Sequence, residues 1–305
     1  MDPRGFSISN TGTYGTAGWM TEKEMKEVFE FSTPDKAEGM ILGERKGKVV
    51  CLPKDTRLNR HTTVFGASGT MKSRAVIRNM IFQCIKRGES VLVSDPKSEL
   101  YNDCSELFRQ NGYEVKVFNL VDPKHSDTWN CMADISDDTL MAQVLTNVII
   151  GNTSQGKGDH FWDNGETNLL KAIVLYVAYD DARTTDQKNL WEVYQMLINT
   201  SEKQLAEMFK RLPLGHPAQA PYRLYEQASD NVRSGILLGL GTRLQVLQNL
   251  EVARLISGND IDLTAPGSKK CAYFIILSDQ ETSMAFLSSL FFSFLFIKLT
   301  RFADG

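Results

Sequence analysis

Eight consecutive residues, Gly66 to Ser73, have the types and the spacing of a phosphate-binding loop, with the sequence GASGTMKS. In such a loop consecutive backbone N–H groups surround an anion, and the helix that follows adds its dipole. Lys72 would reach the terminal phosphates of a nucleotide, and the hydroxyl of Ser73 would bind a magnesium ion. The sequence therefore predicts a site for ATP and Mg²⁺, with Ser73 as the metal ligand. The residues expected to bind the nucleotide here are Gly66, Ala67, Ser68, Gly69, Thr70, Met71, Lys72 and Ser73.

Met71 departs from the usual motif, which has a glycine directly before the lysine. A side chain at this position either tolerates the local backbone or crowds the phosphates, and crowding would reduce or abolish hydrolysis. The alternative to phosphate binding is an ordinary turn between a strand and a helix that contains Lys72 by chance. The flanking sequence favours phosphate binding.

The sequence around the loop supplies the elements that must position it. Thr62 to Phe65 are β-branched or aromatic and predict a short buried strand. Apolar residues then recur at threes and fours from Ile77 to Ile85, as in a helix, and a second strand is expected at Val91–Val93. Asp95 follows that strand at the sheet edge where ligands bind, so it is a further candidate nucleotide-binding residue. It could equally cap the next helix, and the two roles are compatible.

Length and composition indicate a packed globular protein. The chain has 305 residues, enough for one large domain or two moderate ones, and 42% of them are hydrophobic. A formal charge of −3 argues against a protein that coats DNA by net charge alone, although basic residues could line a local groove. The five cysteines are scattered without a C-x-x-C pair, as in a reduced intracellular protein, and the four histidines suggest no zinc site. The polar, glycine-rich start does not have the pattern of a secretory signal.

The rest of the chain predicts an α/β sheet interrupted by helices. Tyr113–Leu120 and Cys271–Leu277 have the pattern of further strands, whereas strand signals disappear between Asp138 and about Gly258. Helical spacing appears there in residues 140–148, 169–177, 190–198, 202–212 and 231–247.

Ahead of the loop, Thr21 and Glu24 have the spacing of a capping box, and a hairpin is expected with its turn at residues 44–47. Near the other end, the charge-free stretch Thr282–Ile297 is apolar enough to suggest a membrane span. It is shorter than a spanning helix requires and contains four serines, so we expect a buried core helix.

The phosphate loop followed by Asp95-Pro96-Lys97 resembles the ring-forming DNA-pumping ATPases, and more narrowly the conjugative coupling proteins of the TraG/VirD family. The pair Phe161-Trp162 is similar to the start of the all-α insertion in that family, and both side chains are expected to pack in the core. Trp129-Asn130 has a similar counterpart there. The resemblance implies an α/β fold, a P-loop RecA-like parallel sheet, incomplete in this chain, with a large all-α insertion. The implied parts are residues 1–61 (an extended and β lead-in), 62–137 (the nucleotide-binding part), 138–260 (all-α) and 261–305 (a return to the α/β core).

In function, the resemblance implies a conjugative DNA transfer coupling protein with ATPase activity. Such proteins form homo-hexamers at the cytoplasmic face of the bacterial membrane, and the present stretch of chain is itself expected to be soluble. They accept single-stranded DNA bound to a relaxase and drive it into a type IV secretion channel. Two alternatives are a DNA translocase of the FtsK/HerA type, which the helical insertion disfavours, and a non-catalytic P-loop docking adaptor.

Asp279 follows the last predicted strand and could be the magnesium-binding carboxylate of a Walker B strand, with Gln280 in place of the catalytic glutamate. The resemblance favours a different alignment, because in coupling proteins a strand and helix of this kind precede the Asp-Glu strand. That strand would then lie beyond Gly305. Whether the chain hydrolyses ATP is left open, and no catalytic residue is assigned.

Overall fold

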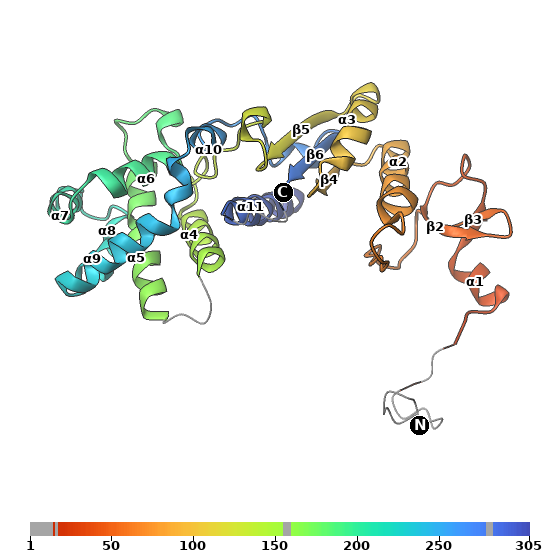
Figure 1. The fold of residues 1–305 in the computed structure, drawn as a ribbon, viewed down its shortest axis with the longest axis horizontal. Coiled ribbons are helices and arrows are strands. Elements are labelled where there is room, and N and C mark those ends of the chain that lie inside the picture. Colours follow the sequence, from red (N-terminus) through yellow and green to blue (C-terminus); the bar gives the residue numbers. More distant parts are fainter. Residues whose placement is uncertain (1–14, 16–17, 155–159, 279–282) are drawn as a thin grey trace. The chain divides into compact units, whose positions relative to one another are not determined.

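The computed structural model describes residue 15 and residues 18–154, 160–278 and 283–305. Contacts divide the chain into two compact units, Met1–Arg87 and Gly88–Gly305, and each is described by itself. Figure 1 labels their helices and strands in chain order.

The first unit begins with a helix and a small antiparallel sheet. Helix α1 (Glu22–Val28) has the predicted capping box: the Thr21 backbone N–H donates to Glu24 Oε2 at 2.7 Å, and Glu24 N donates to Thr21 Oγ1 at 3.3 Å. The strands, in their spatial order, are β1 (Glu30–Ser32), β3 (Lys48–Leu52) and β2 (Met40–Arg45). The predicted hairpin is confirmed, with Lys46 and Gly47 as the turn between β2 and β3.

Around the phosphate loop, one predicted element is absent and another is present. Residues 62–65 form no strand, and the side chain of Phe65 is 91% exposed. β-Branched and aromatic residues favour a strand only where it can pair and bury a face, and this stretch does neither, so the prediction was wrong. The helix after the loop is confirmed. A π-helical turn at Ser73–Ile77 continues into α2 (Arg78–Arg87), which ends at Gly88 in a left-handed conformation, with φ +71°.

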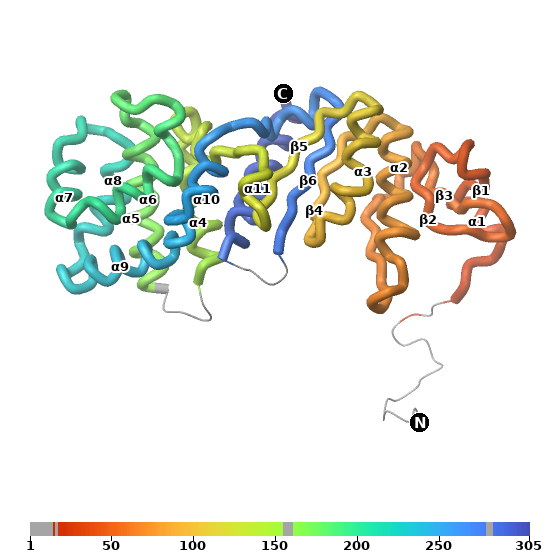
Figure 2. Tube along the Cα trace, turned by 45° about the horizontal axis from the view of Figure 1, so that its top comes forward, coloured from red at the N-terminus to blue at the C-terminus, as the bar shows by residue number. Residues whose placement is uncertain are grey.

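The second unit contains the predicted parallel sheet. Its strands lie in the order β4 (Val91–Ser94), β6 (Cys271–Ile276) and β5 (Glu114–Asn119). All six residues of the central strand β6 are buried, because neighbouring strands and both faces cover it. Figure 2 shows the three strands side by side, with β6 joining the sheet after the whole helical insertion. The α/β class is therefore confirmed.

Helices cover both faces of this sheet. They are α3 (Glu99–Gln110) and α11 (Ala285–Asp304). Phe108 of α3 packs edge-on against Phe274 of β6 at a centroid distance of 6.0 Å, and Phe291 of α11 stacks on Phe118 of β5 at 5.0 Å. Val117 lies opposite Phe274 in the ladder, so its neighbour Phe118 points to the other face. The sheet is thus a middle layer between α3 and α11.

Helix α11 is the apolar helix predicted near the end of the chain. It is the one described helix long and apolar enough to cross a membrane, and 33% of its most apolar window is buried. Its first half packs on Trp129, whose ring lies 5.1 Å from Phe291 and 5.7 Å from Phe294. The predicted core position is confirmed for this half, whereas Phe296 and Phe302 in the second half are exposed.

The insertion between β5 and β6 is helical, as predicted. Its helices are α4 (Thr139–Thr153), α5 (His160–Ala178), α6 (Leu190–Asn199), α7 (Glu202–Lys210), α8 (Gln219–Glu226), α9 (Asp230–Arg243) and α10 (Leu250–Leu255). Short 3₁₀ turns lie at Pro123–His125, Thr185–Gln187, Gln245–Gln248 and Ala265–Gly267. The predicted apolar face of α5 is fully buried. Helices α8 and α10 were not predicted, because Pro221 interrupts the pattern of the first and the second has only six residues.

Phe161 and Trp162 are not core residues, contrary to the prediction. Their side chains are 56% and 40% exposed, and the two rings meet edge-on at 5.6 Å. Trp162 lies against α9 at Gly235, where an added Cβ would come within 2.9 Å of its ring. Burial of these two aromatic residues would need further elements against the first turn of α5, and the local sequence pattern does not record such contacts.

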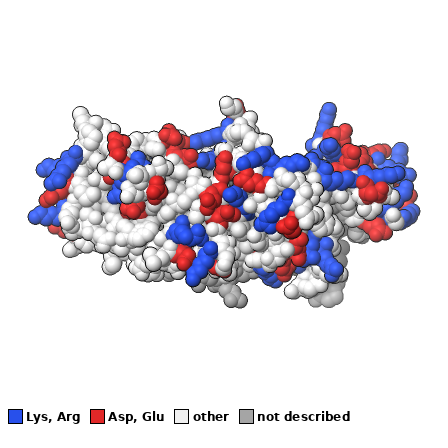
Figure 3. All heavy atoms as spheres, turned by 90° about the horizontal axis from the view of Figure 1, so that it is seen from above, with Lys and Arg blue, Asp and Glu red and all other residues white. Residues whose placement is uncertain are grey.

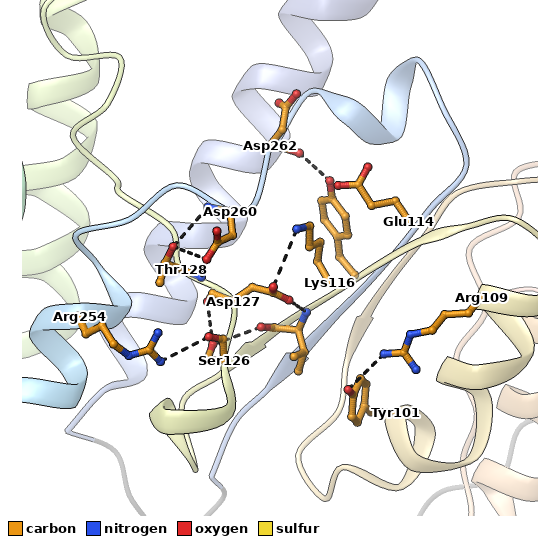
Figure 4. Close-up of polar contacts among 12 residues, drawn as sticks. Tyr101, Arg109, Glu114, Lys116, Ser126, Asp127, Thr128, Arg254, Asp260 and Asp262 are labelled. Atoms are coloured by element: carbon orange, nitrogen blue, oxygen red, sulfur yellow. Dashed lines mark hydrogen bonds and ion pairs between the residues drawn. The ribbon is translucent and has the colours of Figure 1, made fainter. Parts of the chain in front are cut away.

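The helical insertion joins the sheet at a neck where its outgoing and returning segments lie side by side. Trp129 N donates to Leu255 O at 2.9 Å, and Ile261 N donates to Thr128 O at 3.2 Å. Arg254, on the returning segment, donates to three backbone carbonyls of the outgoing one. Figure 4 shows Arg254 turned toward that segment. The neck is therefore held by paired backbone and by one guanidinium.

The same outgoing segment closes the outer edge of β5. Val117 N donates to Asp127 Oδ2 at 2.7 Å, and Asn119 N donates to the Ser126 hydroxyl at 2.8 Å. Figure 4 labels Ser126 and Asp127 on this segment. Side chains thus accept hydrogen bonds from backbone N–H groups of β5 that would otherwise be available to a further strand. Covering an edge in this way prevents unwanted pairing with another chain.

Candidate nucleotide-binding site

The loop from Gly66 to Ser73 folds back on its own lysine. Lys72 Nζ donates to Gly66 O at 2.6 Å and to Ala67 O at 2.9 Å. The hydroxyl of Thr70 donates to the same Ala67 carbonyl at 2.8 Å. The structure therefore gathers the predicted loop residues around the Lys72 ammonium.

Gly66 is required by this compact shape. A Cβ at this position would lie 2.6 Å from Thr70 Oγ1 and 3.2 Å from the Lys72 side chain. The first distance is shorter than real side-chain contacts allow, so Thr70 Oγ1 would have to move, whereas Lys72 would have to shift only slightly. The absence of a side chain at Gly66 thus leaves room for Thr70 and Lys72 where they lie.

Met71 has a left-handed backbone conformation, which a glycine adopts without strain but a methionine does not. Its φ is +57°, in the left-handed region, which costs a non-glycine residue about 1–2 kcal/mol. The side chain is 63% exposed. Whether this side chain tolerates or crowds bound phosphates stays a prediction, since the structure shows only its backbone conformation and its exposure.

The helix behind the loop begins with a turn wider than an α-helical one. Arg78 N donates to Ser73 O, which closes a π-helical turn over Ser73–Ile77, and Ala75 N donates to Met71 O at 2.7 Å. Such turns are rare and occur frequently at functional sites. The N–H groups at the start of a helix lack partners within it, and they are the donors that an anion takes.

Asp95 is described with the second unit, directly after β4. Its backbone N–H continues the ladder by donating to Ile275 O at 2.9 Å, and its side chain is buried. Asp95 Oδ2 accepts a hydrogen bond of 2.8 Å from Tyr101 N, in the first turn of α3. Asp95 is not the expected N-cap, however, because the helix begins at Glu99 and its N-cap position is Ser98. Nucleotide contact stays a prediction.

The described residues test neither of the two metal-related predictions. Asp279 and Gln280 lie outside the described residues, so the Walker B interpretation is not tested. Within residues 18–154, 160–278 and 283–305, no group of three or more His, Cys, Asp or Glu side chains could hold a metal ion. Ser73 stays the predicted metal ligand.

Charge is mixed on the face shown in Figure 3. Lys and Arg lie interspersed with Asp and Glu there, with broad uncharged areas between them. This distribution agrees with the small net charge of −3. Contact with a polyanion on this face would depend on local groups of basic residues.

A cavity of about 980 Å³ with a mixed polar and apolar lining lies in the second unit and was not predicted from the sequence. In it the Arg243 guanidinium lies 2.6 Å from the carboxylates of both Asp163 and Glu166. Burial raises the pKa of Glu166, although the charge of Arg243 opposes this. Gly239 lets Glu166 approach α9, because a Cβ there would lie 2.2 Å from Glu166 Oε1. The spacing of Asp163 and Glu166, on one helix face, was the available signal.

Comparison with known proteins identifies the family. The model of the family described as type IV secretory system conjugative DNA transfer matches residues 8–305. No sequence among the curated proteins matches. Among solved structures, the plasmid coupling protein TrwB in complex with ADP and Mg²⁺ is 18% identical with a TM-score of 0.59, over 88% of this chain and 57% of that one.

Two other TrwB structures give the same result. TrwB with the non-hydrolysable ATP analogue ADPNP is 17% identical with a TM-score of 0.52, and the bacterial conjugative coupling protein TrwBdeltaN70 with sulphate is 16% identical with a TM-score of 0.52. Each match covers 74% of this chain and 49% of the other, so this chain spans about half the length of these structures. The likeness confirms the expected P-loop fold with its helical insertion. Together with the family match over residues 8–305, it places the chain in the family of type IV secretory system conjugative DNA transfer proteins.

Proposed function

We propose that this chain is the nucleotide-binding part, with its helical insertion, of a coupling protein that uses ATP to move DNA into a type IV secretion channel. The observation that carries the proposal is the Lys72 ammonium bound to Gly66 O and Ala67 O, in a chain of the conjugative DNA transfer family. An ammonium has three N–H donors, and the two carbonyls take two of them. The third is left for a phosphate oxygen.

ATP and Mg²⁺ are the proposed ligands. TrwB binds ADPNP in one solved structure and ADP with Mg²⁺ in another, and this chain shares the TrwB fold. Residues 66–73 would hold the phosphates, and the Ser73 hydroxyl would bind the magnesium ion. Asp95 is proposed as a further nucleotide contact, because it stands at the carboxyl end of a parallel strand, where ligands of such sheets bind.

The proposed partners belong to the whole protein. They are relaxase-bound single-stranded DNA, the components of the secretion channel, and further copies of the protein in a hexameric ring at the cytoplasmic face of the membrane. Family membership supports them. We also propose the four-part division into residues 1–61, 62–137, 138–260 and 261–305, since the insertion does separate β5 from β6.

The test is the affinity of the chain for ATP in the presence of Mg²⁺, measured by calorimetry for the wild type and for Lys72→Ala. Removal of the ammonium should weaken binding by at least about tenfold, or roughly 1.4 kcal/mol. Lys203→Ala, an exposed lysine of α7, is the matched control and should bind as the wild type does. Equal affinity of wild type and Lys72→Ala would show that the loop is not the nucleotide site.

A further inference from the structure

A positively charged hollow of about 260 Å³ opens between α1 and the sheet of the first unit. Its charged lining consists of Lys26, Arg45, Lys46 and Lys48 with a single carboxylate, Glu22. The chain as a whole has 37 acidic and 34 basic residues, so this surplus of positive charge is local.

The sheet register explains why these cations meet. Arg45 and Lys48 are directly opposite each other at the end of the β2–β3 hairpin, so both side chains leave the same face. Phe31 lies opposite Val50, two residues along from Lys48, and therefore shares that face. Helix α1 adds Met25 to the lining. The hollow thus combines cationic groups with two apolar side chains, Phe31 and Met25, both half-buried.

Glu22 neutralises only part of this charge. Its Oε1 accepts a hydrogen bond from Lys46 Nζ at 2.5 Å and another from Arg45 Nη2 at 3.3 Å. These two cations lower the pKa of Glu22, Lys46 most strongly. Lys26 and Lys48 make no side-chain hydrogen bond and no ion pair within residues 18–87, the described part of this unit.

Two local rules of stability are broken at this hairpin end. Lys46 has a φ of +52° and Gly47 a φ of +75°, so both residues of the turn are in the left-handed region. The first position of such a turn favours Asn, Asp or Gly over lysine. Arg45 and Lys48 are like charges directly opposite each other, a pairing that destabilises a sheet. Violations of local rules that cluster at one place are typical of functional sites.

We infer that this hollow binds a phosphate group, with Lys26 and Lys48 as its free cationic ligands and Phe31 and Met25 against the apolar part of the molecule that carries it. An anion would relieve the repulsion between Arg45 and Lys48 more fully than the ion pair of Arg45 with Glu22 does. A doubly charged phosphate fits a surplus of several cations better than a singly charged carboxylate does. The carrier is either a small soluble phosphate compound or the head group of a lipid.

The inference goes beyond the proposed function, because it needs neither the phosphate loop nor ATP turnover. The test therefore uses the Lys72→Ala chain throughout, so that the loop cannot contribute. One arm measures binding of inorganic pyrophosphate by calorimetry. The other measures sedimentation with phosphatidylcholine vesicles, with and without phosphatidic acid.

Three variants of that chain are compared in both arms. Lys26→Ala with Lys48→Ala removes the two free cations, and Lys23→Ala with Lys54→Ala removes the same charge outside the hollow. Binding to pyrophosphate, to phosphatidic acid vesicles, or to both should fall at least about tenfold in the first variant and stay unchanged in the second. The third variant, Lys26→Arg with Lys48→Arg, keeps both positive charges and should retain phosphate binding.

The two arms separate the sources of the phosphate. Pyrophosphate binding alone identifies a soluble ligand, and binding to phosphatidic acid vesicles alone identifies a lipid head group. Absence of binding in both arms, or an equal loss in the Lys23 and Lys54 control, would overturn the inference. Lys46→Asn adds an independent check: it suits the turn, so thermal stability should hold or rise while phosphate binding weakens.

Discussion

The Thr128 hydroxyl donates a hydrogen bond of 2.6 Å to Asp260 Oδ2, and the Thr128 backbone N–H donates to the same oxygen at 3.0 Å. The two residues are 132 positions apart, on the segments that leave and re-enter the sheet (Figure 4). Gly258 permits this approach, because a Cβ there would lie 2.3 Å from Thr128 Oγ1. The Asp260 carboxylate thus adds to the backbone pairs and the Arg254 guanidinium that join the two ends of the helical insertion.

Asp260→Ala should lower the free energy of unfolding at neutral pH. The lost hydrogen bonds involve a charged group, but Asp260 is exposed, so we expect about 1 kcal/mol. The hydrogen bonds from Thr128 lower the pKa of Asp260 below its ordinary value of 3.8. Its contribution is therefore complete above that value and lost as the pH falls through the lower folded-state pKa.

Urea unfolding at pH 7 and at about pH 3 measures this effect. The difference between wild type and Asp260→Ala should shrink at the lower pH. Asp181 is an exposed aspartate within the helical insertion, and Asp181→Ala should have the same free energy of unfolding as the wild type at both pH values. A difference that is the same at both pH values would mean that the charge of Asp260 does not strengthen the neck.

Met71→Gly should leave ATP affinity equal or raise it. Glycine removes the left-handed strain of about 1–2 kcal/mol but also frees the unfolded chain, so stability should change little. Met71→Ala is the matched control, because it shortens the side chain and keeps the strained Cβ. If ATP binding falls more than about tenfold in Met71→Gly and not in Met71→Ala, then the loop needs a Cβ atom at this left-handed position in order to bind ATP.

Gly66→Ala should weaken ATP binding through the position of Lys72. The new Cβ would lie 2.6 Å from Thr70 Oγ1, so the threonine must move and the lysine must shift slightly. Thr70→Ala removes that oxygen, and Gly66→Ala should then cost less affinity in the double variant than alone. Calorimetry of the four chains measures the coupling. Strictly additive losses would show that Thr70 and Gly66 act separately.

The sequence was informative wherever local pattern and tertiary environment agree. Strand β6 was predictable because a central parallel strand is buried on both faces, and its six residues are all apolar. The capping box at Thr21 was predictable because it needs only residues three positions apart. Phe65 and Phe161 were misplaced because their burial depends on whether another element covers them, which no local pattern records.

The candidate site was predictable in its residues and less so in its shape. The motif identified the loop, and Met71 marked one of its two positions with a positive φ, since a glycine normally stands there; the other is Gly69. The π-helical turn at Ser73–Ile77 has no sequence signature. The pairing of Arg243 with Glu166 joins two helices far apart in the chain, so only the packed structure shows it.

Gly239 and Gly241 allow the packing of α9 to be tested within one helix. A Cβ at Gly239 would lie 2.2 Å from Glu166 Oε1, whereas a Cβ at Gly241 meets nothing within 4 Å. Gly241→Ala should therefore stabilise the protein by about 0.5–1 kcal/mol, as alanine does in a helix. Gly239→Ala should destabilise it by about 1–3 kcal/mol, because it forces a buried carboxylate away from Arg243.

Chemical unfolding of both variants measures the contrast, and a second background assigns its cause. In a Glu166→Ala chain the opposing oxygen is absent, so Gly239→Ala should become stabilising, as Gly241→Ala is in either background. Glu166→Ala leaves Arg243 paired with Asp163 at 2.6 Å, so the guanidinium does not become an unpaired charge. If Gly239→Ala stabilises the wild-type chain as much as Gly241→Ala does, Glu166 does not lie against α9. If it destabilises both backgrounds equally, the contact responsible is a different one.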